Sequence, residues 1–149
     1  MNKPLSNFDF LNFVKHLGIK YFRGIFSSDN LPNIISKKCR IINLDSKIGP
    51  GTHRVCYKSI DDCCEYFDSF ELKMPKDIQK YMATSNKQIV YSGDEIQEHD
   101  SVLCGYEDLY YLLERQRGSS ILQNIHNFKF DISDQSVNQR FIINYFRNI

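Results

Sequence analysis

Two β-rich runs joined by a short polar connection limit the fold of this chain more than any other feature. Residues 53–57 and 64–68 contain Val, Cys, Tyr and Phe, and residues 59–62 between them read Ser-Ile-Asp-Asp. Runs of this kind predict an antiparallel hairpin. The chain must therefore form a sheet, and the helical segments on either side of the hairpin make the predicted fold α+β.

Helical periodicity and capping residues predict helices before and after the hairpin. Ser6 begins the first helix, Asp9 completes a capping box three residues later, and Gly18 ends it. Further helices are expected over 75–83, 105–116 and from Asp134 onward, with one or two more helical turns over 119–127. The other strands are expected over 40–44 and 87–91, and 21–26 is expected to be a short strand or an extended segment. No internal repeat, linker or low-complexity segment divides the sequence, so we expect one compact domain over residues 1–149.

The composition excludes several classes of protein. Of the 149 residues, 42% are hydrophobic and 25% are charged, a globular mixture that argues against disorder and coiled coil. A net charge of +1 gives no support for tight nucleic-acid binding through bulk charge. No apolar run approaches the ~18 residues that cross a bilayer, and no secretory signal is visible. We therefore expect a protein that is not secreted and has no membrane partner.

The cysteine content favours reduced thiols over a disulfide framework, because the chain has five cysteines and no export signal. A zinc site would have to draw on His53, Cys56, Cys63 and Cys64. Neighbouring residues on a strand point to opposite faces, and the chain has no Cys-x-x-Cys pair. We therefore expect neither a metal nor another cofactor, and a catalytic thiol becomes the main alternative. The five cysteines are Cys39, Cys56, Cys63, Cys64 and Cys104.

His53 and Asp68 are the first candidate site residues. If the hairpin is symmetric about Ile60 and Asp61, His53 lies opposite Asp68 with both side chains on one face. A carboxylate that holds one imidazole nitrogen leaves the other nitrogen free to take a proton from a thiol. The alternative is a surface histidine in an ordinary cross-strand pair.

Cys104 is the candidate thiol because it directly precedes Gly105 and the helix expected over 105–116. The dipole and the free N–H groups of a helix N-terminus favour a thiolate. Gln97 lies seven residues earlier, and its amide would share the stabilisation of an oxyanion with the backbone N–H of Cys104. The alternatives are a buried apolar cysteine and a solvent-exposed glutamine.

These pieces form an ordered pattern that resembles the adenovirus-type, adenain-like cysteine proteases. The resemblance is closest to the proteases of Maverick/Polinton transposons and related viruses, and more distant to the proteases that cut SUMO and other ubiquitin-like modifiers. Segments 21–32, 39–44 and 134–138 also fit, so the resemblance covers most of the chain. The motifs that carry it are Gly51-Thr52-His53, Tyr66-Phe67-Asp68-Ser69-Phe70, Gln97 and Ser101-Val102-Leu103-Cys104-Gly105-Tyr106.

The resemblance implies a papain-like fold, with a central mixed or antiparallel sheet flanked by helices and a nucleophile at the N-terminus of the central helix. It implies that Cys104 is the nucleophile, His53 the general base, Asp68 the residue that orients His53, and Gln97 the oxyanion donor.

The implied function is that of a cysteine endopeptidase from a virus or a virus-like transposon. Its substrates would be capsid or core precursor proteins cleaved during virion maturation, with a viral peptide or DNA as activator. Its location would be the host nucleus or cytoplasm, or the virion. Two alternatives are a deconjugating isopeptidase for SUMO-like or ubiquitin-like modifiers, and a catalytically weakened copy that acts as a binding or structural protein.

Three departures from the family pattern keep the weakened copy open as an alternative. Arg54 stands where the family has Trp after the catalytic His, and Glu71 stands where it has Gly. Glu107 and Asp108 follow the Cys-Gly-Tyr motif in place of apolar residues or a second Cys. Acidic residues in the first turn suit the helix dipole, but they oppose a nearby thiolate.

Overall fold

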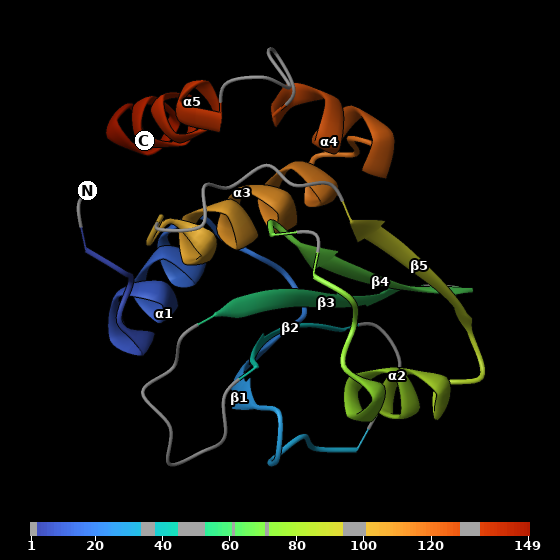
Figure 1. The fold of residues 1–149 in the computed structure, drawn as a ribbon. Coiled ribbons are helices and arrows are strands. Elements are labelled where there is room, and N and C mark those ends of the chain that lie inside the picture. Colours follow the sequence, from blue (N-terminus) through green and yellow to red (C-terminus); the bar gives the residue numbers. More distant parts are fainter. Residues whose placement is uncertain are drawn as a thin grey trace.

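The computed structural model describes residues 3–33, 38–44, 53–60, 62–70, 72–93, 101–128 and 135–149, which form five helices and five strands (Figure 1). No helix within these ranges has the length and hydropathy that a bilayer span requires. In chain order the elements are α1 (Asn7–His16), β1 (Phe22–Ser27), β2 (Lys38–Asn43), β3 (Arg54–Ile60), β4 (Cys63–Asp68), α2 (Lys76–Ala83), β5 (Gln88–Gly93), α3 (Cys104–Gln116), α4 (Ile121–Phe128) and α5 (Gln135–Arg147).

The strands form one mixed sheet in the order β1-β2-β3-β4-β5. The two inner pairings, β2 with β3 and β3 with β4, are antiparallel, whereas the two outer pairings are parallel. Parallel neighbours need a crossover connection, and α2 supplies it between β4 and β5. The predicted α+β class with a central mixed sheet is confirmed.

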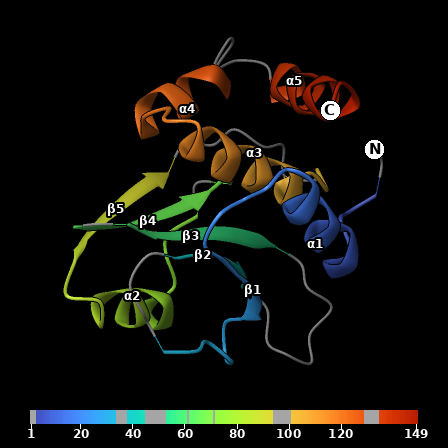
Figure 2. The same ribbon diagram turned by 180° about the vertical axis from the view of Figure 1, so that it is seen from behind.

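Helices cover both faces of the sheet. α1, α3, α4 and α5 lie on one side and α2 lies on the other, as opposite views show (Figures 1 and 2). Along the strands, side chains alternate between the two sides, as the pleat requires. Cys56 and Phe67 join the core under α3, whereas Val55, Tyr57 and Tyr66 join the core beside α2.

α3 is buried around most of its circumference, although the sequence predicts only one apolar face. Every residue from Gly105 to Leu113 is buried, and Glu107 and Asp108 are among them. The reason is that α3 packs on β3 and β4 and also contacts α1, α4 and α5. Its polar residues therefore lie inside the protein, where an amphipathic surface helix would expose them.

The hairpin register differs by two residues from the symmetric register that we expected. Tyr57 pairs with Tyr66, whereas symmetry about Ile60 and Asp61 would place it opposite Cys64. β3 continues to Ile60 and β4 begins at Cys63, so the two strands are joined by two residues, the commonest hairpin connection. A shift of two residues leaves every side chain on its predicted face.

Truncation of Phe67 should strongly destabilise the fold. Its ring is buried and stacks on Tyr111 with 4.4 Å between ring centroids. We expect Phe67→Ala to lower the free energy of unfolding by about 3–5 kcal/mol in urea denaturation, because it leaves a cavity in the core. The control Phe8→Ala removes a ring that is 72% exposed and should cost no more than about 0.5 kcal/mol. Equal effects of the two substitutions would contradict the proposed core.

Candidate active site

His53 and Asp68 are in direct contact inside the protein. His53 directly precedes β3, Asp68 ends β4, and both are buried. The imidazole Nε2 lies 2.7 Å from Oδ1 of Asp68, within hydrogen-bond distance. Because the two-residue register shift keeps both side chains on one face, they still meet, although they are not direct cross-strand partners.

Phe70 contacts both His53 and Asp68. Its backbone N–H donates to Oδ1 of Asp68 at 2.9 Å, and its ring lies against the imidazole of His53 with 4.4 Å between centroids. Phe70 is not among the site residues that the sequence predicts. The available signal was Asp-Ser-Phe at the end of a strand, because an Asp side chain often accepts from the N–H two residues further on.

The second imidazole nitrogen is available for proton transfer. Nδ1 of His53 is buried and has no hydrogen-bond partner in the described part of the chain. When Nε2–H donates to Asp68, Nδ1 of the neutral ring carries the lone pair. The imidazole of His53 can therefore act as a base, and its contact with Asp68 fixes its orientation.

Cys104 lies beside the strand that begins after His53. It is the first residue of α3, and its sulfur accepts a hydrogen bond from the backbone N–H of Arg54. Burial raises the pKa of the Cys104 thiol to about 11, with further increases from Asp108 and Glu107 and decreases from the Arg54 N–H and charge. The group is therefore a thiol at neutral pH.

Gln97, the predicted oxyanion donor, lies outside the described residues.

The cysteines of the zinc site that the sequence disfavours do not converge with His53. Cys56 is fully buried on the face opposite to Val55 and Tyr57, and burial raises the pKa of its thiol well above the ordinary value. Within the described ranges, no three His, Cys, Asp or Glu side chains are grouped so that they could hold a metal ion.

Glu107 and Asp108 are fully buried next to this site. Burial raises the pKa of Glu107 to about 8, with Asp68 adding to the rise and the Ser69 hydroxyl opposing it. The pKa of Asp108 lies well above its ordinary value because of burial, Glu107 and Asp68. Glu107 is therefore mostly protonated at neutral pH, so its repulsion of a thiolate grows in the alkaline range. Burial likewise favours the protonated form of Asp108.

Arg54 connects three parts of the fold. Its guanidinium donates to the Leu5 carbonyl oxygen and to Oδ1 of Asn7. Its charge also lowers the pKa values of Asp108 and Cys104. A Cβ on Gly105 would lie only 3.2 Å from Nη1 of Arg54, so the missing side chain makes room for the guanidinium.

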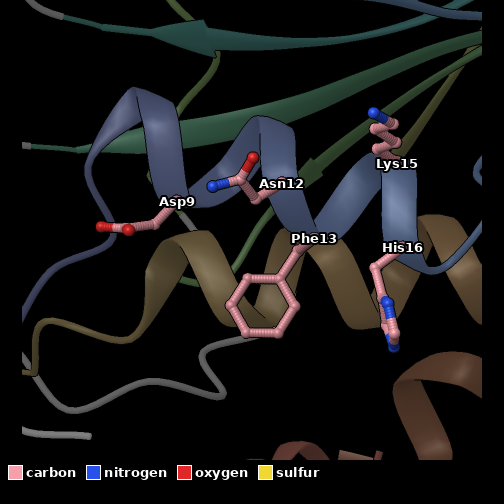
Figure 3. A pocket seen from close by; sticks show the side chains of 5 residues that line it. All are labelled: Asp9, Asn12, Phe13, Lys15 and His16. Carbon is pink, nitrogen blue, oxygen red and sulfur yellow. The ribbon is translucent and has the colours of Figure 1, made fainter.

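A surface hollow lies elsewhere, along α1. It has a volume of about 690 Å³ and is shown in Figure 3. None of the described residues that line it belongs to the group around His53, so the hollow adds nothing to this site. Those residues are Asp9, Asn12, Phe13, Lys15 and His16.

Comparison with known proteins identifies the fold. The structure is similar to the crystal structure of the ASFV pS273R protease, with a TM-score of 0.53 and 15% sequence identity. The match covers 84% of this chain and 62% of that protein, so the chain spans less than two thirds of that protein's length. No protein-family model matches the sequence, and no curated protein sequence matches it. The α+β fold is therefore that of a protease-like domain.

Stability should fall as the pH rises, because of the buried acids. Glu107 keeps its proton to about pH 8 in the folded protein, whereas its ordinary value is 4.5. Between these values the folded state binds more protons than the unfolded state, so the free energy of unfolding decreases with increasing pH. Glu107→Gln should make this decrease smaller in urea denaturation at pH 5 and pH 8.

Glu114→Gln is a matched control on the same helix, where the carboxylate pairs with Arg117 near the surface. That variant should keep the wild-type pH dependence. An unchanged pH dependence in Glu107→Gln would contradict the assigned protonation of Glu107.

Proposed function

We propose that this protein is a cysteine endopeptidase of a virus or a virus-like transposon, of the adenain-like type. The observation that carries the proposal is the arrangement at the start of α3. The Cys104 sulfur accepts the N–H of Arg54, the residue after His53. His53 itself contacts Asp68 through Nε2, and no described residue makes a hydrogen bond with its Nδ1. The similarity of the fold to a viral cysteine protease supports this assignment.

In the proposed reaction, the thiol of Cys104 is activated during the attack. Nδ1 of His53 takes the proton from Sγ while Sγ forms a bond to the substrate carbonyl carbon. Asp68 stabilises the resulting imidazolium through the Nε2–H hydrogen bond. Proton transfer during the attack is consistent with a cysteine that is a thiol in the free enzyme, because the reaction then requires no thiolate before the substrate binds.

The imidazolium then returns its proton. Nδ1–H protonates the leaving amine as the C–N bond breaks, which leaves an acyl group on Sγ. His53 next deprotonates a water molecule that attacks the thioester, and the breakdown of that intermediate regenerates the thiol. Gln97 and the Cys104 backbone N–H would stabilise the oxyanion in both halves of the reaction.

The resemblance in sequence motifs suggests the biological setting. The proposed substrates are capsid or core precursor proteins that are cut during virion maturation, and a viral peptide or DNA is the proposed activator. An isopeptidase that removes SUMO-like modifiers would use the same four residues. Covalent capture of Cys104 by a modifier-derived probe would favour that alternative.

A catalytically weakened copy is a second candidate function, and one observation favours it. Burial and the two neighbouring acids place the pKa of Cys104 at about 11, above its ordinary value of 9.0. Such a protein would keep the fold and the His53–Asp68 contact and would act by binding. The cleavage assays below separate the two candidates.

Removal of the thiol should abolish cleavage. We expect Cys104→Ala to lower kcat/KM by at least about 10⁴-fold, since the attacking atom is lost. The assay is cleavage of a proteome-derived peptide library, followed by mass spectrometry. Cys63→Ala is the matched control, because Cys63 is a partly exposed thiol on β4, and it should cleave like the wild type.

Two results would contradict the endopeptidase proposal. Cleavage by Cys104→Ala at the wild-type rate would show that another group is the nucleophile. No cleavage by the wild-type protein, together with slow alkylation of Cys104 by iodoacetamide that His53→Ala does not change, would favour the weakened copy.

Loss of the Gln97 amide should slow the chemical step more than it weakens substrate binding. If the amide donates to the oxyanion, Gln97→Ala should lower kcat by on the order of 10²–10³ with little change in KM. Gln97→Glu keeps the size of the side chain but replaces the donor with a carboxylate, so it should be at least as slow. Wild-type kcat in both variants would remove Gln97 from the proposed site.

A further inference from the structure

An enclosed pocket lies at the far end of α3 from Cys104. Its volume is about 270 Å³, and Leu112 and Arg115 of α3 form part of its wall. Arg115 is eleven residues after Cys104, which corresponds to about 16 Å along a helix. The opposite walls come from Ile19, Cys39 of β2 and Lys58 of β3. We call this the Lys58 pocket.

Lys58 is a buried side chain without a direct partner. It is only 7% exposed, and it makes no hydrogen bond or ion pair with any other residue in the described ranges. Lysine side chains are rarely this buried unless they are paired with a carboxylate. Burial lowers the pKa of Lys58, because the charged form of the side chain loses contact with water.

The carboxylate of Glu65, the cross-strand partner of Lys58, already accepts hydrogen bonds from other residues. Glu65 pairs with Lys58 across β3 and β4, but it accepts hydrogen bonds from Nε and Nη2 of Arg115 and from the hydroxyl of Tyr111. The bonds from Arg115 Nε and from Tyr111 are both 2.9 Å long. Two of the guanidinium nitrogens are therefore engaged with Glu65, and the Lys58 ammonium makes no hydrogen bond with any described residue.

The walls of the pocket are fixed before any ligand binds. Gln116 accepts the Lys20 N–H at 2.6 Å and donates to the Gly18 carbonyl oxygen at 3.0 Å. The Cys39 thiol donates to the Lys20 carbonyl oxygen at 3.4 Å. These bonds tie the segment that precedes β1 to α3 and β2. Preformed walls lower the entropic cost of binding.

We propose that the Lys58 pocket binds a single carboxylate group carried by a small apolar body. The carboxylate pairs with the Lys58 ammonium, and the apolar body lies against Ile19, Cys39 and Leu112. A monoanion fits better than a dianion such as phosphate, because the negative charge of Glu65 lies close by. The proposed site is separate from the residues of the proposed protease reaction and does not depend on them.

Two sources would supply this chemistry: a free carboxylic acid, or the C-terminal carboxylate of a peptide that ends in an apolar residue. Both present one negative charge next to an apolar group. The experiment therefore has one arm for each source, and each arm pairs a carboxylate with its neutral amide.

The probes are phenylacetate with phenylacetamide, and a short peptide ending in Phe with either a free or an amidated C-terminus. Binding is followed by chemical-shift changes in two-dimensional NMR of the full chain. We expect the carboxylate of at least one pair to bind at least about tenfold more tightly than its amide. The arm that shows this difference identifies the source.

Two lysine variants test the assignment of the pocket. Lys58→Met should lose the preference for carboxylate and should stay folded, because the Lys58 ammonium makes no hydrogen bond or ion pair with a described residue. Lys80→Met is the matched control: its side chain is exposed on α2, on the other side of the sheet (Figures 1 and 2). It should bind like the wild type.

Three results would overturn the proposal. They are no binding of either carboxylate, equal binding of carboxylate and amide in both arms, and unchanged carboxylate binding by Lys58→Met. The comparison of acid with amide uses the wild-type protein alone, so it stays decisive even if a variant fails to fold.

Discussion

The packing of α3 on β3 is the contact on which the rest of this structure depends. It buries the first turns of α3, so the Cys104 sulfur meets the backbone N–H of Arg54, the residue that follows His53. It also leaves Gly105 against the Arg54 guanidinium, where a Cβ would lie 3.2 Å from Nη1. A helix exposed on one side would not hold these groups together, because its first turn would be free to move away from the strand.

The same packing explains the unusual chemistry of the acids at the start of α3. In a solvent-exposed first turn, Glu107 and Asp108 would be ionised and would interact favourably with the helix dipole. Burial instead favours the protonated form of both acids, because a buried charge without a partner is costly. Two residues that look unfavourable for a thiolate in the sequence therefore repel it less than ionised acids on a surface helix would.

α3 also links two sites of different character. Cys104 lies at its first turn, and Arg115 lines the Lys58 pocket at its last. Both sites contain a titratable group whose pKa is shifted by burial: a thiol at one end and a lysine ammonium near the other. The central helix is thus the framework on which both proposals rest, although each depends on different residues.

The sequence by itself determined the order and type of the elements, because helical periodicity, capping residues and alternating strands are local signals. It also determined that His53 and Asp68 share one face, since a register error of two residues does not change the side on which a side chain lies. Only the tertiary structure decided the register itself, the burial of Glu107, the role of Phe70 at the His53–Asp68 pair and the isolation of Lys58. These features depend on contacts between segments far apart in the chain, and local sequence carries no signal for the distance between such segments.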